Sequence, residues 1–146
     1  MSGYLVVAYQ TAASEELVAA LAAIAQRDLE SEFTLLVPAT RINHLMTWTE
    51  GESEEVARST AVVASRVLRE AGLNIESTVI GQADPMKAIE EMAQMRDGMF
   101  EAVVISTLPL GLSRWLKRDL PSRVQSRLGI RVEHIVARPK ARTTAA

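Results

Sequence analysis

Five short apolar runs alternate along the chain with longer segments in which apolar residues recur at helical spacing. Three runs are apolar throughout, as expected of strands buried on both faces, and two alternate polar with apolar residues, as expected of half-exposed strands. The continuous runs are Tyr4–Tyr9, Phe33–Val37 and Ala102–Ile105, and the alternating runs are Leu73–Ile80 and Ile130–Val136. The pattern predicts five strands separated by four helices.

The predicted helices begin and end at residues with recognised capping roles. Ser14 is a good N-cap, and Asp84-Pro85 combines an N-cap with proline at the first helical position. Gly72, Gly98 and Gly129 are placed to end helices. We expect helices from Ser14 to about Asp28, from Glu52 to Ala71, from Asp84 to Gly98, and from Leu120 to Leu128.

Helical spacing also predicts which side chains face the core. The expected inward residues are Leu17, Leu21, Ile24 and Ala25 in the first helix, Val56, Thr60, Val63 and Val67 in the second, and Ala88, Ile89, Met92 and Ala93 in the third.

Strands that alternate with helices predict a doubly wound α/β domain, in which a five-stranded parallel sheet is covered by helices on both faces. The two alternating runs suit the sheet edges, and the three continuous runs suit its centre. The order 3-2-1-4-5 satisfies this distribution, whereas the order 2-1-3-4-5 would expose Phe33–Val37 at an edge. We therefore predict the order 3-2-1-4-5.

Composition narrows the class of protein. The chain of 146 residues has 48% hydrophobic residues, a net charge of -2 and no cysteine. The length favours a single domain over residues 1–138, and the polar residues 139–146 suit a disordered tail. The net charge disfavours nucleic-acid binding, and the lack of cysteine excludes thiolate metal sites. The amino terminus has no basic segment before its apolar run, and no run is long enough to span a membrane. We expect a cytoplasmic protein.

In the predicted order, the first and fourth strands diverge at a switch point, where open α/β sheets bind ligands beyond the carboxyl ends of their strands. Tyr9, Gln10 and Thr11 follow the first strand, and the segment from Ser106 to Gly111 follows the fourth. Pro38 ends the second strand beside them. This crevice is the predicted ligand site.

The chain resembles the universal stress protein family of the adenine-nucleotide alpha-hydrolase-like fold. The resemblance covers nearly all of Tyr4 to Ala137 and includes the long loop after the second strand and Asp84-Pro85 at the third helix. It is most specific at Gly111-Leu-Ser-Arg114 before the fourth helix and at Arg123-Val124 within it. The resemblance implies a stress-response binding protein, with ATP or AMP as candidate ligand and a homodimer formed through the fifth strand.

The ATP-binding loop of that family, G-x2-G-x9-G-S/T, is degenerate here. Ser106 and Pro109 occupy the first two glycine positions, and Arg118-Asp119 replaces the final Gly-Ser pair. Gln10 or Thr11 stands where the family carries an Asp. Proline removes an N–H donor, and Asp119 is placed to cap the helix amides that would otherwise bind an anion.

Basic residues near this loop could offset the charge of a bound phosphate. The candidate ligand residues here are Thr107, Ser113, Arg114, Lys117, Arg118 and Asp119. Alternatively, Trp115 and Leu116 pack under the loop while the cations remain solvated.

The chain has two histidines, His44 and His134, without the spacing of a metal site. His134 lies in the predicted fifth strand, between Val132 and Val136. An unpaired edge strand invites pairing with another chain. We interpret Val132, His134 and Val136 as a dimer edge.

We predict a regulatory binding protein without catalytic residues, because no G-x-S-x-G elbow or acid–base pair is present. Two alternatives remain open. One is a nucleotide-using enzyme of the same fold, with Ser106, Thr107, Arg114 and Lys117 handling phosphates. The other is a dimeric interaction scaffold that binds no ligand.

Overall fold

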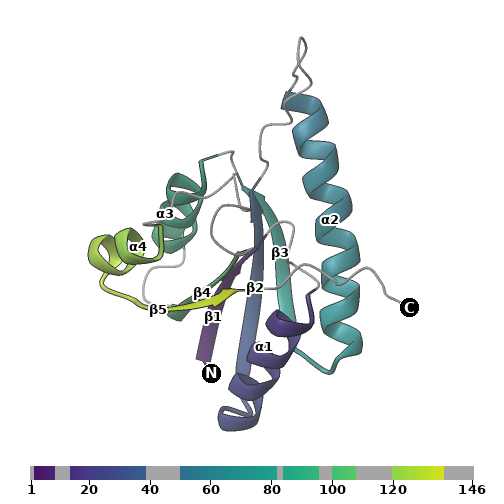
Figure 1. Ribbon diagram of the computed structural model, residues 1–146, viewed down its shortest axis with the longest axis vertical. Helices are drawn as coiled ribbons and strands as arrows, with labels where there is room; N and C mark the ends of the chain where they lie inside the picture. The colour runs from purple at the N-terminus through teal and green to yellow at the C-terminus, as the bar shows by residue number, and fades with distance from the viewer. Residues whose placement is uncertain are drawn as a thin grey trace.

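The computed structural model describes residues 2–8, 14–38, 50–81, 84–95, 100–107 and 120–136. Within these ranges, strands and helices alternate from one end of the chain to the other (Figure 1). The elements are β1 (Ser2–Val7), α1 (Glu15–Arg27), β2 (Ser31–Pro38), α2 (Glu50–Glu70), β3 (Ile75–Gly81), α3 (Pro85–Met95), β4 (Phe100–Thr107), α4 (Leu120–Leu128) and β5 (Arg131–Val136).

The five strands form one parallel sheet in the order β3-β2-β1-β4-β5, which confirms the predicted fold class and strand order. The apolar strands β1, β2 and β4 occupy the centre. The alternating strands β3 and β5 lie at the two edges. A strand whose sequence is apolar throughout is therefore correctly placed at the centre of this sheet, and a strand that alternates is correctly placed at an edge.

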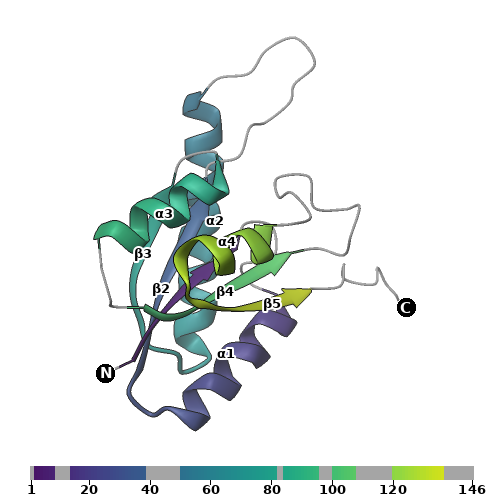
Figure 2. The same cartoon turned by 90° about the vertical axis from the view of Figure 1, so that its left-hand side faces the viewer.

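Helices cover both faces of the sheet, so the domain has three layers and two apolar cores. Figures 1 and 2 show α1 and α2 on one face and α3 and α4 on the other. Alternate residues of each central strand serve the two cores: Val104 packs on the α1 and α2 side, whereas Val103 and Ile105 pack on the α3 and α4 side. This alternation is the two-residue period of an extended strand.

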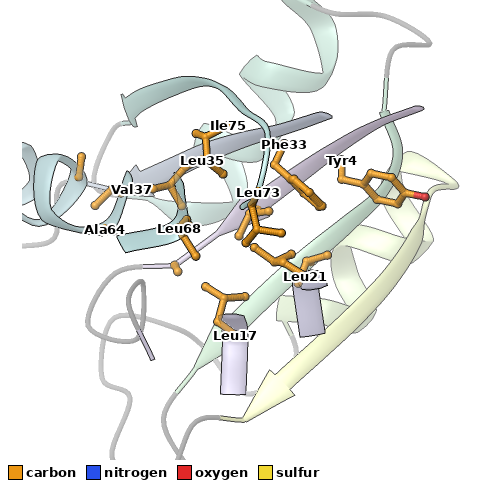
Figure 3. Close-up of a cluster of buried hydrophobic side chains, with 14 of the residues drawn as sticks. Tyr4, Leu17, Leu21, Phe33, Leu35, Val37, Ala64, Leu68, Leu73 and Ile75 are labelled. Atoms are coloured by element: carbon orange, nitrogen blue, oxygen red, sulfur yellow. The ribbon is translucent and has the colours of Figure 1, made fainter. Parts of the chain in front are cut away.

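The core beneath α1 and α2 contains the largest side chains (Figure 3). Leu17 and Leu21 of α1 are fully buried against it, as predicted. The rings of Tyr4 and Phe33 lie on adjacent strands with their centroids 5.6 Å apart. The pKa of Tyr4 is raised, mainly by burial and further by the negative charge of the nearby Glu101 carboxylate. The Tyr4 hydroxyl donates a hydrogen bond to Glu101 Oε2 at 3.4 Å.

The predicted N-caps are confirmed. Ser14 Oγ accepts a hydrogen bond from the Leu17 N–H at 3.2 Å. Asp84 Oδ1 accepts from the Met86 N–H at 3.0 Å, and Pro85 is the first residue of α3. Each carboxylate or hydroxyl satisfies an amide that has no partner within its helix.

A Schellman motif ends α2 and explains why β3 begins later than predicted. The Gly72 N–H donates to Arg69 O and the Leu73 N–H donates to Leu68 O, with Gly72 at φ +91°. Leu73 therefore belongs to the helix terminus, and the strand starts at Ile75 rather than at Leu73. At the other end, β4 continues to Thr107, two residues beyond the predicted run.

The predicted inward face of α2 is wrong. Its buried side chains are those of Ala57, Ala61, Ala64 and Leu68. Val63, expected inside, is 53% exposed, and Thr60 and Val67 are only half-buried. Three alanines let the helix backbone approach the sheet closely, and this small-residue face replaces the larger valines that hydrophobicity alone selects.

None of the described helices combines the length and the apolar character needed to cross a membrane.

Gly81 at the end of β3 is a point of close packing. A Cβ at this position would lie 2.8 Å from Ala88 Cβ of α3 and 2.8 Å from Leu36 Cδ1 of β2. We expect Gly81→Ala to destabilise the domain by about 1–3 kcal/mol, the usual cost of overpacking. Chemical denaturation measures this change.

In the comparison variant Gly129→Asn, open space surrounds the new side chain and asparagine tolerates the positive φ of +67°. We expect a smaller loss there, and equal losses would contradict the packing argument.

Candidate functional site

The carboxyl ends of β1 and β4 lie side by side at the switch point of the sheet. The two strands pair in parallel, with Val7 beside Ile105. Right-handed crossovers lead away from this pair in opposite directions, to β2 on one side and to β5 on the other. The described residues at the ends of β1, β2 and β4 are Ala8, Pro38, Ser106 and Thr107, and all four are buried.

Ser106 and Thr107 end β4 and belong to opposite faces of the sheet. Ser106 shares its face with Val104, toward α1 and α2, and Thr107 shares its face with Ile105, toward α3 and α4. Ser106 is fully buried and Thr107 is 5% exposed. The two hydroxyl-bearing side chains at the end of β4 therefore lie within the layers on either side of the sheet.

The Thr107 hydroxyl is engaged by His134 of the edge strand β5. Thr107 Oγ1 and His134 Nε2 lie 2.7 Å apart, within hydrogen-bond distance. The register places His134 beside Ile105, so the contact runs diagonally across the β4–β5 pair on the face toward α3 and α4. Sequence reasoning missed this pair, because the contact depends on a register that the residues of either strand alone do not reveal.

Withdrawal of part of the His134 ring from water lowers its pKa below the ordinary value. The neutral ring can accept the Thr107 O–H at Nε2, or donate from Nε2 to Thr107 Oγ1, depending on its tautomer. The charged residues of the packing helix α4 are Arg123 and Arg127. Arg127 pairs with Glu90 of α3 at 3.4 Å.

The predicted dimer edge is only partly exposed. Val132 packs against the core beneath α3 and α4, whereas Val136 is 46% exposed and His134 is also exposed. On the opposite face of β5, Arg131 and Glu133 form an ion pair at 3.9 Å. The free edge thus carries apolar and aromatic side chains on one face and a charge pair on the other.

Most predicted ligand residues lie outside the described ranges, as does His44. They are Tyr9, Gln10, Thr11, Gly111, Ser113, Arg114, Lys117, Arg118 and Asp119. Of the predicted set, the structure describes Pro38, Ser106 and Thr107, and it places all three at the carboxyl ends of their strands. The described residues contain no group of three or more His, Cys, Asp or Glu side chains suited to hold a metal ion.

A five-stranded parallel sheet of this order, with its switch point between β1 and β4, defines a doubly wound α/β fold. Among solved structures, the chain is similar to universal stress proteins, as the sequence resemblance implied. These likenesses, at low sequence identity, confirm the resemblance at the level of the fold. No protein-family model and no curated protein sequence matches the chain.

Three solved structures illustrate the likeness. A universal stress protein family protein from Arabidopsis thaliana, with AMP bound, aligns with a TM-score of 0.64 and 14% identity over 99% of this chain and 97% of that chain. The universal stress protein from Archaeoglobus fulgidus aligns with a TM-score of 0.60 and 16% identity, covering 92% of this chain and 93% of that chain. UspA from Lactobacillus plantarum aligns with a TM-score of 0.60 and 17% identity, covering 92% and 97%.

The lowered pKa of His134 predicts how the stability of the folded protein changes with pH. The pKa of His134 in the folded protein lies below its value of about 6.5 in the unfolded chain. As the pH falls, His134 is therefore protonated in the unfolded chain before it is protonated in the folded protein. The contribution of the neutral ring to stability is therefore complete above about pH 6.5 and is lost as the pH falls toward the folded pKa. We expect a proton NMR titration of His134 to give a midpoint below 6.5. We expect His134→Gln to flatten the pH dependence of the unfolding free energy as the pH falls below about 6.5. A midpoint at or above 6.5 would show that the ring is not desolvated.

Proposed function

We propose that this chain is a universal-stress-like regulatory protein that binds an adenine nucleotide at the carboxyl ends of β1 and β4. The observation that carries the proposal is the alignment of 99% of the chain with a universal stress protein structure that contains AMP. The strand order supports the same location independently, because it puts the switch point of the sheet between β1 and β4.

We propose a preference for a nucleotide with few phosphates. The segment after β4 carries Pro109, which has no N–H to donate, and it carries Arg118-Asp119 where a phosphate-binding loop has Gly-Ser. A carboxylate about 4 Å from a phosphate charge costs about 4 kcal/mol at an effective dielectric constant near 20. A triphosphate extends this repulsion over more charge than a monophosphate does. AMP is therefore a better candidate than ATP.

The residues proposed to line the nucleotide site come from three segments. They are Tyr9, Gln10 and Thr11 after β1, Pro38 at the end of β2, and Ser106, Thr107, Gly111, Ser113, Arg114, Lys117, Arg118 and Asp119 from the end of β4 to the start of α4. The buried Ser106 and Thr107 contribute backbone rather than hydroxyl groups. The bond between Thr107 and His134 fixes the hydroxyl at the base of this site.

A binding role fits this site better than a catalytic one. Thr107 and His134 have the separation of a nucleophile and its general base, but a nucleophile must also reach its substrate. Thr107 is 5% exposed, so its hydroxyl lies beneath the surface that a substrate would touch. We therefore assign the pair a positioning role.

We also propose that two copies associate through the edges of their β5 strands. An exposed edge strand presents unpaired N–H and C=O groups, and antiparallel pairing with a second β5 satisfies them. The partly exposed Val136 and His134 would then be covered.

Thermal unfolding with AMP and with Mg-ATP tests the ligand. A nucleotide present at 100 times its dissociation constant adds about 2.7 kcal/mol to the stability of the folded state. We expect AMP to raise the unfolding temperature at concentrations where Mg-ATP has a smaller effect. Guanosine monophosphate serves as the control for the base. If none of the three nucleotides shifts the transition at millimolar concentration, the proposed ligand class is wrong.

The double variant Arg118→Gly and Asp119→Ser tests the origin of the preference. It restores the Gly-Ser pair, removes the carboxylate and frees the amides at the start of α4 for phosphate. We expect Mg-ATP affinity to rise about tenfold or more, while AMP affinity changes less, as measured by isothermal titration calorimetry. Arg118→Gly alone is the matched control, because it keeps the carboxylate. An equal gain in ATP affinity in that single variant would remove Asp119 from the explanation.

A further inference from the structure

The outer face of α2 carries exposed apolar side chains. Val62 is 52% exposed and Val63 is 53% exposed, halfway along a helix whose buried inner face consists of three alanines and Leu68. Among the described elements, α2 packs mainly on β2 and β3. Figure 1 shows it standing along one side of the molecule, with its amino-terminal end rising beyond the ends of the strands.

Four exposed residues form a stripe along this face, which we term the outer stripe: Glu55, Ser59, Val62 and Arg66. Their separations are four, three and four residues, which is the spacing of the contact positions in a pair of packed helices. Val63 lies beside the stripe. Acidic charge lies at the amino-terminal end of the stripe and basic charge at its carboxyl-terminal end.

The stripe is complementary to itself. When two such helices pack antiparallel about a twofold axis, Glu55 lies opposite Arg66 of the second copy, and Ser59 lies opposite Val62 of the second copy. Each pairing then occurs twice, as a twofold interface requires. Parallel packing would instead place Glu55 opposite Glu55 and Arg66 opposite Arg66, which is repulsive. We propose that the outer stripe of α2 binds a second copy of this chain in the antiparallel orientation.

The charged residues of the stripe are available for this contact. Within the described part of the chain, neither Glu55 nor Arg66 forms an ion pair, and both are exposed. Association therefore adds two pairs without breaking one between residues that the structure describes. It also covers the two exposed valines, so electrostatic and hydrophobic terms favour the same arrangement.

The surface beside the stripe is hollowed. A shallow depression of about 430 Å³ is lined by Val62, Ser65, Arg66, Arg69 and Glu70. Its wall is held in place because Arg69 Nη2 donates to the Ile75 carbonyl oxygen at 3.0 Å, across the turn from α2 to β3. In the antiparallel arrangement, the Val62 and Arg66 walls of this depression lie opposite Ser59 and Glu55 of the second copy.

This interface is separate from the β5 edge. The helix α2 packs on β2 and β3, at the opposite side of the sheet from β5. Both contacts can therefore form in the same assembly. Each is a twofold interface, and together they build a species larger than a dimer.

Charge reversal in solution tests the proposal, with sedimentation velocity over a range of protein concentrations as the measurement. Glu55→Arg and Arg66→Glu each place like charges opposite one another, and we expect each to weaken the α2-mediated association about tenfold. The double variant, and an equimolar mixture of the two single variants, restore opposite charges across the interface. We expect both to recover association to within about threefold of the wild type. Lys87→Glu, an exposed charge reversal on α3, is the matched control and should change nothing.

Cross-linking identifies the interface, because the native chain has no cysteine. We expect a mixture of Ser59→Cys and Val62→Cys chains to form a mixed dimer on oxidation, whereas Lys87→Cys with either chain should not. The result is independent of β5 and of nucleotide binding, because it reports only the α2 contact. Association that is unchanged in both single charge variants, failure of the double variant and the mixture to recover it, or absence of the mixed cross-link would overturn the proposal.

Discussion

The parallel pairing of β1 with β4 is the constraint on which the rest of the structure depends. It brings together strands separated by most of the chain, with Tyr4 beside Ala102 and Val7 beside Ile105. Because β2 and β3 lie on one side of this pair and β5 on the other, the direction in which successive strands are added to the sheet reverses there. The switch point at the carboxyl ends of β1 and β4 follows from that reversal. Burial of both faces of β1 and β4 beneath helices makes the pairing stable and gives the site a rigid base.

Much of this arrangement was predictable because burial on both faces leaves a clear trace in a sequence. Phe33–Val37 and Ala102–Ile105 contain no charged residue, and such runs are compatible only with the middle of a covered sheet. The face of α2 was not predictable in the same way. Hydrophobic spacing selected Val63, but the closeness of helix and sheet required Ala57, Ala61 and Ala64. Hydrophobicity reports the free energy of burial, whereas packing also depends on the space available.

The candidate site also has one feature that was predictable from the sequence and one that was not. Its position follows from strand order, which the sequence indicates, and Pro38, Ser106 and Thr107 lie where that order puts them. The partnership between Thr107 and His134 depends instead on the stagger of β4 against β5. A change of one residue in this register would turn His134 to the opposite face of the sheet. Pairwise chemistry across strands is thus the part of a site that residue types alone do not specify.

The incorrectly predicted face of α2 is also its most informative one. Turning Val62 and Val63 outward gives up the free energy that their burial would provide, and the inner alanines supply less apolar area in return. Scattered exposed valines are ordinary on protein surfaces, but these two lie within a stripe whose opposite charges are arranged symmetrically about its centre. A solvated helix face has no need for such symmetry, because water pairs with Glu55 and Arg66 equally well in any order. A second copy of the same helix does need it, and antiparallel packing covers the valines that the core leaves exposed.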